Sequence, residues 1–322
     1  MALALGIDVG GTKILAAAVD DAGEVVVEER VESPKDGGSL FDAIGDAVAL
    51  VVARLGGRAA EVHGAGAGLP GLIDLEGVLH DAPNLPAAAN SAAGAELRRR
   101  VEAVLGRRMR VVVENDATAA AAGELAFGAA RSVANAVVVT LGTGIGGGLV
   151  GNGRLLRGER GFAGEIGHMV VELDGPRCAC GGQGCWEQFA SGTGLARLGR
   201  EAALGGASPL LAEALAARGE VRGEDVVDAA RRGDGAALDV VAAFARYLAI
   251  GLSNLAEIFD PGRLILGGGL VRAADVLFAT VPERFAEHRR GAGEAKVDIV
   301  VAELGERAGV AGAAALALGL VT

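Results

Sequence analysis

Residues 3–19 read LALGIDVGGTKILAAAV, a glycine-rich turn between two apolar runs. Short apolar runs bounded by glycine predict β-strands, here over residues 3–9 and 14–19. Glycine carries no Cβ, so a turn of this kind can point several backbone N–H groups into one concavity, where they bind phosphate oxygens. The stretch therefore predicts a strand, an anion-binding turn and a second strand.

This arrangement returns further along the chain. Residues 136–150 read AVVVTLGTGIGGGLV, and a third apolar run, 263–266, leads into three glycines at 267–269. Helix-forming stretches such as 118–127 and 236–259 alternate with the strands. The sequence predicts an α/β protein with two similar domains.

The domain limit follows from the repeat, because no low-complexity linker separates the halves. We place the limit near residue 117. The closing apolar segment, 308–321, can pack back on the first domain and make it discontinuous. The predicted lobes are residues 1–117 plus 304–322, with the first glycine turn, and residues 118–303, with the other two glycine turns.

The composition sets the broad class. The chain has 322 residues, of which 51% are hydrophobic, enough for two buried cores. Segment 308–321, of about 14 residues, is too short to span a bilayer and suits a buried helix. No basic leader precedes Asp8, so we expect a cytoplasmic protein without a membrane partner.

The formal net charge of −11 argues against nucleic acid as a partner, because phosphate backbones are repelled. One basic cluster stands out, but apolar residues at helical spacing accompany it, as on the solvated face of a helix. The basic residues are Arg98, Arg99, Arg100, Arg107, Arg108 and Arg110, and the apolar ones are Leu97, Val101, Val104 and Leu105.

The three glycine turns are candidate phosphate loops, and Thr12 and Thr143 add hydroxyl donors. Tight hairpins without a ligand are the alternative. The dinucleotide fingerprint Gly-x-Gly-x-x-Gly is matched at 142–147, but that motif opens a helix and an apolar strand-like run follows here. Asp8 precedes the first turn and could hold Mg²⁺ in an outer shell, or cap the turn.

All three cysteines lie within eight residues, and a histidine lies ten positions upstream. Three thiolates and one imidazole make a closed tetrahedral zinc set, which leaves no open position and indicates a structural ion. A disulfide would leave an odd thiol and suits the cytosol poorly. We therefore predict a structural Zn²⁺ held by His168, Cys178, Cys180 and Cys185.

Acidic side chains surround these motifs. Asp116 follows an apolar strand, 111–113, and precedes a helix, the junction at which α/β proteins bind ligands. Asn115 or Asp116 could instead cap that helix. Glu165 and Glu187 flank the zinc segment, and both could be loop carboxylates satisfied by backbone donors.

Together the motifs resemble those of the repressor, open reading frame, kinase (ROK) family, and the run 186–192, WEQFASG, is similar to its bacterial ATP-dependent glucokinases. The resemblance spans residues 8–269, and the zinc segment is its most specific part. The motifs are DVGGTK at 8–13, ENDA at 114–117, LGTG at 141–144, GEIGH at 164–168 and CACGGQGCWE at 178–187.

The resemblance implies an actin-like ATPase (ribonuclease H-like) fold, with two similar lobes, a cleft between them, and phosphorylation of glucose at its 6-hydroxyl by ATP and Mg²⁺ in carbohydrate metabolism and glycolysis. It implies a homodimer or higher homo-oligomer. The family's catalytic base corresponds to Asp116. Its sugar ligands correspond to Asn115, Asp116, Glu165, His168 and Glu187 and, less closely, to Gly71 and Asn84. Its ATP-binding positions correspond to Asp8, Gly10, Gly11, Thr12, Lys13, Gly142, Thr143, Gly144, Gly267, Gly268 and Gly269.

Three other functions fit parts of the sequence. A ROK kinase for mannose, fructose or an N-acetylhexosamine would carry the same motifs. A sugar-sensing transcriptional regulator of the same family would carry a helix-turn-helix ahead of the first glycine turn, where only seven residues precede Asp8. An actin-like scaffold would leave Glu165, His168 and Glu187 unexplained.

Overall fold

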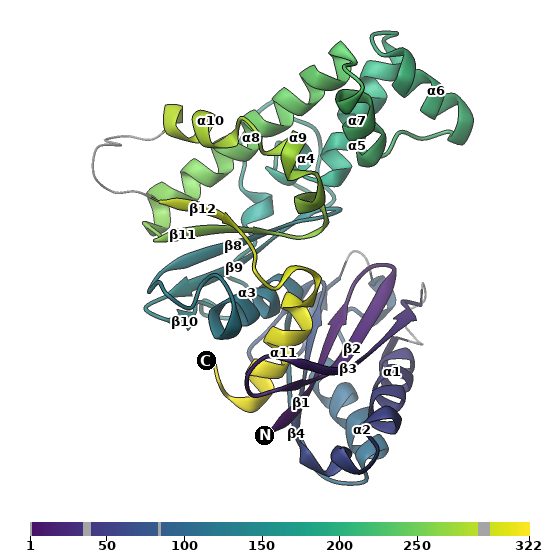
Figure 1. Ribbon diagram of the computed structural model, residues 1–322, viewed down its shortest axis with the longest axis vertical. Helices are drawn as coiled ribbons and strands as arrows, with labels where there is room; N and C mark the ends of the chain where they lie inside the picture. Colours follow the sequence, from purple (N-terminus) through teal and green to yellow (C-terminus); the bar gives the residue numbers. More distant parts are fainter. Residues whose placement is uncertain (1, 35–39, 83–84, 289–296) are drawn as a thin grey trace. The chain divides into compact units, whose positions relative to one another are not determined.

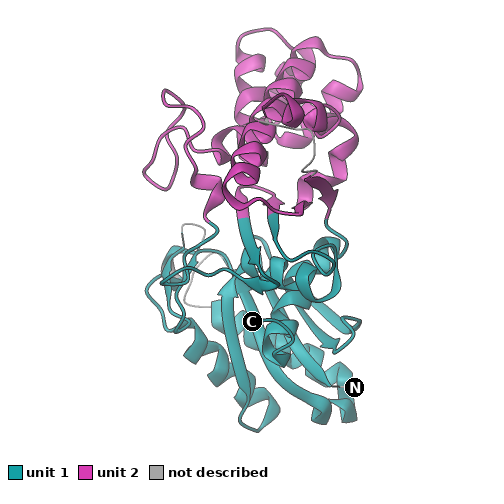
Figure 2. Ribbon diagram, turned by 90° about the vertical axis from the view of Figure 1, so that its left-hand side faces the viewer, with its two compact units in different colours: residues 1–138, 147–164, 302–322 teal, residues 139–146, 165–301 magenta. Residues whose placement is uncertain are grey.

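The structure is a computed structural model, which describes residues 2–34, 40–82, 85–288 and 297–322 (Figure 1). The chain divides into two compact units (Figure 2). Unit 1 comprises residues 1–138, 147–164 and 302–322, and unit 2 comprises residues 139–146 and 165–301. Asn84 lies outside the described residues.

A five-stranded sheet of order β3-β2-β1-β4-β7 forms the centre of unit 1. β1 pairs antiparallel with β2 and parallel with β4, and β4 pairs parallel with β7. The predicted first strand, turn and second strand are therefore the β1–β2 hairpin. The strands are β1 (Leu3–Val9), β2 (Lys13–Asp20), β3 (Val25–Glu32), β4 (Val62–Leu69) and β7 (Arg110–Asn115), and a separate hairpin joins β5 (Leu72–Ile73) to β6 (Leu79–Asp81).

Helices cover both faces of this sheet. They are α1 (Leu40–Leu55), α2 (Ala93–Leu105), α3 (Asp116–Phe127) and α11 (Ala308–Leu318), with short 3-10 turns η2 (Gly56–Glu61), η3 (Pro86–Ala88) and η6 (Gly305–Arg307). Leu3, Leu5 and Ile7 of β1 lie in one core with residues of α1 and α2, whereas Ala4 lies in a second core with α11. Because successive side chains of a strand point to opposite faces, Asp8 shares the α11 face with Ala4.

The packing of α11 requires small residues, because its backbone lies directly on the sheet and on α3. An added Cβ on Gly6 would collide with the carbonyl oxygen of Val310, and one on Gly66 with that of Ala313. The predicted return of the C-terminal apolar segment to the first domain is thus observed within unit 1.

A second sheet has the order β10-β9-β8-β11-β12, which repeats the plan of the first. In both sheets the first of three consecutive strands, β1 or β8, also lies next to a strand from later in the chain, β4 or β11, as the predicted sequence repeat requires. Its strands are β8 (Ala136–Leu141), β9 (Ile145–Gly151), β10 (Arg154–Leu155), β11 (Arg263–Gly267) and β12 (Asp298–Val301).

Unit 2 also contains a set of helices around the long α8. They are η4 (Ile166–His168), α4 (Glu187–Ala190), α5 (Gly192–Leu204), α6 (Pro209–Arg218), α7 (Gly223–Arg231), α8 (Gly235–Phe259), η5 (Gly269–Ala273), α9 (Ala274–Leu277) and α10 (Val281–His288). Within the described ranges, α8 is the one helix long and apolar enough to cross a membrane by length and composition, and half of its most apolar window is buried. Core helices of soluble proteins have the same properties.

The two units do not follow the predicted lobe limits. α3 and β10 lie in unit 1, because α3 packs against α11 and residues 147–164 return to that unit. The predicted lobes, 1–117 plus 304–322 and 118–303, therefore stay a prediction from the sequence repeat.

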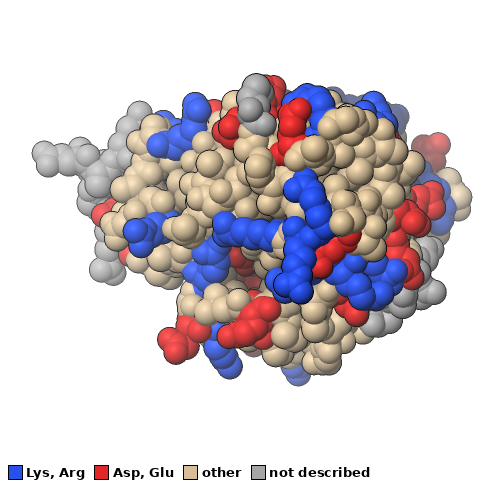
Figure 3. Space-filling model, turned by 90° about the horizontal axis from the view of Figure 1, so that it is seen from below, with Lys and Arg blue, Asp and Glu red and all other residues tan. Residues whose placement is uncertain are grey.

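Three of the six arginines in the basic cluster near α2 pair with acidic side chains or a backbone carbonyl. Arg99 pairs with Glu96 at 2.5 Å, Arg100 pairs with Asp42, and Arg107 donates to the carbonyl of Val62 at 2.6 Å. On the face seen in Figure 3, blue and red side chains are interspersed. This mixture fits a solvated helix face.

Candidate active site and metal centre

Asp116 begins α3 directly after β7 ends at Asn115, so the predicted strand-to-helix junction is present. Both side chains accept hydrogen bonds at the start of the helix. Asn115 Oδ1 accepts from the backbone N–H of Ala117 at 2.9 Å and of Thr118 at 3.0 Å, and Asp116 Oδ1 accepts from Ala117 N–H at 2.8 Å. The capping interpretation is therefore correct for Asn115, whereas Asp116 is the first residue of the helix and is held there by its neighbour's N–H.

Burial raises the pKa of Asp116, against the opposing effect of its hydrogen bond from Ala117. Burial, and then the neighbouring charge of Asp116, raise the pKa of Asp8 to about 7. Gly68 pairs with Asp8 in the sheet, and an added Cβ on Gly68 would lie 3.2 Å from Cα of Asp116. The absence of a side chain at Gly68 lets the two carboxylates share one region of unit 1.

The first glycine turn closes the β1–β2 hairpin. Gly10 N–H donates to the carbonyl of Lys13 at 2.8 Å, and all four residues of the turn, 10–13, are exposed. An added Cβ on Gly11 would meet no atom within 4 Å. The turn is thus a tight hairpin whose exposed residues remain accessible to a ligand.

Gly71 has a φ of 128°, and an added Cβ would collide with the carbonyl oxygen of Asp81, so only glycine fits there. Its own carbonyl accepts from Asn115 Nδ2 at 3.2 Å. The structure therefore brings together Gly71, Asn115 and Asp116, which the sequence assigned to one site.

The second glycine turn is shorter than expected. It comprises residues 142–144, because the glycines at 146–148 lie inside strand β9. The strand that follows excludes the dinucleotide-binding helix. The start of α5 holds the turn: Gly192 N–H donates to the carbonyl of Gly142 at 2.8 Å, and Thr193 Oγ1 donates to that of Thr143 at 2.8 Å.

The third glycine turn lies against the second. Gly267 ends strand β11 and Gly269 begins η5, so Gly268 alone forms the turn, with a φ of 84°. An added Cβ on Gly268 would collide with the carbonyl oxygen of Leu141, directly before the second turn. Two glycine turns far apart in sequence thus adjoin within unit 2.

Glu187, at the start of α4, contacts the second glycine turn. Its Oε2 accepts from the backbone N–H of Ile145 at 2.9 Å, and an added Cβ on Gly144 would collide with the same oxygen. An added Cβ on Gly167 would collide with the carbonyl oxygen of Ile145, so η4 approaches the same residue from its other side. The predicted sugar ligand Glu187 and the turn that carries His168 therefore meet at Ile145.

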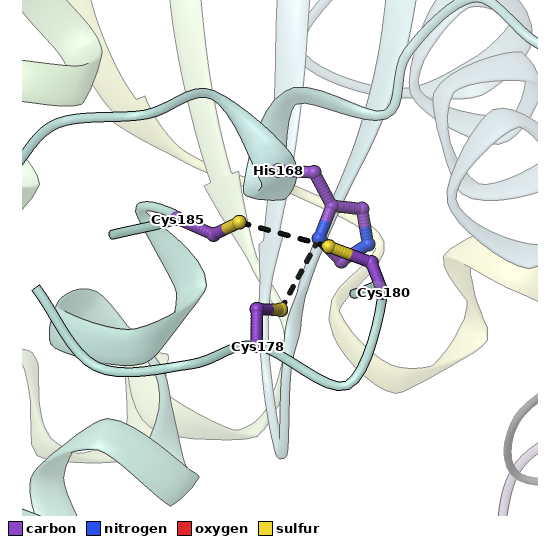
Figure 4. Close-up of side chains that lie close together, drawn as sticks. All are labelled: His168, Cys178, Cys180 and Cys185. Carbon is purple, nitrogen blue, oxygen red and sulfur yellow. Dashed lines mark hydrogen bonds between the residues drawn. The ribbon is translucent and has the colours of Figure 1, made fainter. Parts of the chain in front are cut away.

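The predicted zinc ligands form one cluster, in which the three Sγ atoms and one ring nitrogen of His168 lie within 4.8 Å of one another (Figure 4). Cys180 Sγ lies 3.7 Å from Cys185 Sγ, and Cys178 Sγ lies 3.6 Å from His168 Nδ1. Tetrahedral zinc with bonds of about 2.3 Å to sulfur separates two sulfurs by about 3.8 Å. The donor set and its spacing both fit Zn²⁺.

The glycines between the cysteines make this geometry accessible. Gly184 has a φ of 72°, and an added Cβ would collide with the carbonyl oxygen of Glu172. An added Cβ on Gly182 would lie 3.3 Å from the sulfurs of both Cys180 and Cys185. On its other side, His168 Nε2 lies 3.8 Å from Glu165 Oε2, so the imidazole faces the thiols with one nitrogen and a carboxylate with the other.

Sequence reasoning missed the partner of Glu114. Its buried carboxylate receives a 2.6 Å hydrogen bond from Arg157 Nε, and its other oxygen accepts from Asn115 N–H at 3.2 Å. Arg157 lies 43 positions away. The only sequence signal was a carboxylate directly after the apolar run 111–113, which requires a partner if buried but does not identify it.

Comparison with known proteins leads to the same family as the sequence motifs. A glucokinase from Streptomyces coelicolor is 39% identical over 324 residues, with 98% of each chain covered. A glucokinase from Halalkalibacterium halodurans is 36% identical over 312 residues, covering 96% of this chain and 92% of the relative. The crystal structure of a ROK family glucokinase from Streptomyces griseus, in complex with glucose and AMPPNP, superposes with a TM-score of 0.85 at 36% identity, covering 98% and 99% of the two chains.

The paired sheets of equal strand order and their glycine hairpins define an α/β protein with the actin-like ATPase fold, the fold of ROK kinases. The sequence profile of the ROK family matches residues 4–319. The chain belongs to the ROK family, and the predicted fold class and family are both confirmed.

Proposed function

We propose that this protein is an ATP-dependent glucokinase, which transfers the γ-phosphoryl group of ATP to the 6-hydroxyl of glucose. The observation that carries the proposal is the Asp116 carboxylate, held at the β7–α3 junction beside Asn115 and Gly71 with a raised pKa. Full-length relatives with this activity, at 36–39% identity, support it.

Phosphoryl transfer needs a positioned hydroxyl, stabilisation of the phosphate charge and a group that takes the hydroxyl proton. We assign the last role to Asp116. Its Oδ1 is held by Ala117 N–H, which fixes the carboxylate while Oδ2 accepts the proton of the sugar. A raised pKa brings a carboxylate closer to the operating pH and makes it a better base.

We assign the other sugar hydroxyls to Asn115, Glu165, His168 and Glu187, with Gly71 and Asn84 as further contacts. Carboxylates and amides discriminate hydroxyl patterns strongly, because a buried acceptor left without its donor is costly. Zn²⁺ on the three cysteines and His168 Nδ1 would fix the second ring nitrogen, Nε2, as a donor toward a hydroxyl. The ion is structural in this proposal.

We assign the three glycine turns to ATP. The positions are Gly10, Gly11, Thr12, Lys13, Gly142, Thr143, Gly144, Gly267, Gly268 and Gly269. Asp8 would bind Mg²⁺ through water, since hard cations prefer carboxylate and water oxygens. Mg²⁺ neutralises the charge of the transferring phosphates.

The proposal is tested by ADP release across glucose, mannose, fructose and N-acetylglucosamine, with the wild type and Asp116→Asn. We expect glucose to give the highest kcat/KM. General-base catalysis contributes about 10²- to 10⁴-fold, so Asp116→Asn should lose about that much kcat with an unchanged circular dichroism spectrum. Near-normal turnover of the variant would remove Asp116 from this role, and preference for another hexose would favour a different ROK kinase.

We further propose a cytoplasmic homodimer or higher homo-oligomer. A cluster of three free cysteines suits a reducing compartment. Leu173 and Val170, which are 82% and 54% exposed beside the metal cluster, offer apolar surface for association. Light scattering after gel filtration measures the oligomer, and a monomer at micromolar concentration would contradict it.

A further inference from the structure

Glu187, which the proposed function assigns to the hexose, also lies against the glycine turn that it assigns to the ATP phosphates. Its Oε2 holds the N–H of Ile145 at 2.9 Å, directly after the second glycine turn. Among the residues that the structure describes, none donates a hydrogen bond to its Oε1, which can accept one from a sugar hydroxyl. One carboxylate can thus serve both substrates.

We propose that Glu187 couples hexose affinity to the shape of the phosphate turn at residues 142–144. The inference rests on the proposed function and adds to it a positioning role for Gly144. The carboxylate occupies the space that any side chain at residue 144 would take. Movement of the turn must therefore move Glu187, and movement of Glu187 must move the turn.

The surrounding contacts make the turn a rigid part of this link. The segment 187–193 holds the turn at both ends. Gly192 and Thr193 donate to the carbonyls at its start, residues 142 and 143, and Glu187 accepts from Ile145 N–H directly after it. The turn also closes on itself, with Gly142 N–H donating to the carbonyl of Gly144 at 3.0 Å. A sugar that orders Glu187 would therefore order the turn before ATP binds.

Thermodynamic coupling is reciprocal, so each direction gives its own test. The first compares Gly144→Ala with Gly142→Ala, two additions of one methyl group within the same turn. The Cβ at residue 144 collides with Glu187 Oε2, whereas the Cβ at residue 142 would meet no atom within 4 Å. Neither glycine has a positive φ, so both backbones accept alanine.

Glucose binding is measured by calorimetry without nucleotide, so that altered phosphate contacts cannot contribute. We expect Gly144→Ala to weaken glucose binding by about 5- to 150-fold, the usual range of coupling between sites, and Gly142→Ala to change it by less than about 2-fold. Equal glucose affinity in Gly144→Ala and the wild type would overturn the coupling, as would an equal loss in both variants. A wild type that binds no glucose would instead refute the proposed function.

The second test covers the case in which Gly144→Ala does not fold. Glu187→Gln removes the charge on the carboxylate that holds Ile145, and Glu165→Gln changes another proposed sugar ligand, which faces His168. AMPPNP affinity is measured without sugar. We expect Glu187→Gln to weaken it about 5-fold or more and Glu165→Gln to leave it within about 2-fold. Unchanged AMPPNP affinity in Glu187→Gln would overturn the proposal.

Discussion

At the residue scale, the strongest constraint in unit 1 is the proximity of two carboxylates. Asp8 carries a pKa of about 7 because it is buried and because Asp116 is near. At pH values between 3.8, the ordinary pKa of an aspartate, and about 7, the folded protein keeps a proton on Asp8 that the unfolded chain releases. Stability therefore falls as pH rises through this window, and the full cost is present above pH 7.

Asp8→Asn removes this cost and should raise the melting temperature more at pH 8 than at pH 5. We expect a gain of at least about 2–4 °C at pH 8, because about 1 kcal/mol alone produces that shift in a domain of about 200 residues and a pKa raised to about 7 corresponds to more. The same variant should lose kinase activity at all pH values if Asp8 organises Mg²⁺. Thermal unfolding at the two pH values, without nucleotide, measures the effect.

Asp74→Asn is the matched control for this prediction. Its hydrogen bonds, first from Val78 N–H, lower the pKa of Asp74 in the folded protein. Ionised Asp74 therefore stabilises the fold at every pH above the pKa that it has in the unfolded chain. The substitution should therefore lower the melting temperature at pH 8, the opposite sign. A loss of stability in both variants at pH 8 would contradict the interpretation of Asp8.

At the element scale, α11 meets its neighbours through small residues that we call the glycine seam: Gly6, Gly66, Gly123 and Gly312. An added Cβ on Gly123 would collide with the carbonyl oxygen of Ala308, and one on Gly312 with that of Ala119. The alternation of large and small residues in β1 already contained this information, because Leu3, Leu5 and Ile7 face one core while Ala4 and Gly6 face α11.

Gly312→Ala should destabilise unit 1 by about 1–3 kcal/mol, the usual cost of adding a methyl group to a filled core. The control is Gly57→Ala in η2, where the added Cβ would meet no atom within 4 Å and φ is not positive. Urea unfolding of both variants measures the difference. An equal free energy of unfolding in the two variants would show that α11 can move away from α3 without cost.

Much of the fold and part of the site were predictable because they depend on local patterns. The β1–β2 hairpin, the junction at Asp116 and the clustering of His168 with the three cysteines all follow from short motifs. Contacts across long separations were not predictable. Glu124 is fully buried and accepts from the N–H groups of Glu303 and Leu304, about 180 positions away, and nothing near it in sequence indicates those donors.

The same limit explains the errors in the glycine turns. The glycine-rich run 142–148 predicts one long turn, but residues 146–148 lie in β9, where Gly148 faces α3 and an added Cβ would collide with Ala121. Close packing between elements, which the chain pattern does not record, decided the conformation.

At the scale of the whole molecule, a zinc ion held by the cluster of three cysteines and one histidine should stabilise one unit and not the other. All four ligands lie in unit 2, between residues 168 and 185. The single Trp, Trp186, is fully buried directly after Cys185, and the single Tyr, Tyr247, accepts through its carbonyl the hydrogen bond of Trp186 Nε1 at 2.8 Å. Trp fluorescence therefore reports on unit 2 alone, whereas circular dichroism reports on both units.

Removal of zinc should split thermal unfolding into two steps. A structural ion that binds only the folded state stabilises by mass action, so chelation lowers the unfolding temperature of unit 2 while unit 1 keeps its own core. Trp186 emission should then shift to longer wavelength before the main loss of helical circular dichroism.

With Mg²⁺ restored, the metal-free protein should show a glucose KM raised about 10-fold or more, because His168 loses its fixed orientation. Added Zn²⁺ should reverse both changes, and Cys180→Ser should reproduce them. A metal-free protein with one coincident transition and an unchanged KM would mean that the hydrogen bonds around Trp186, and not the ion, hold this segment in place.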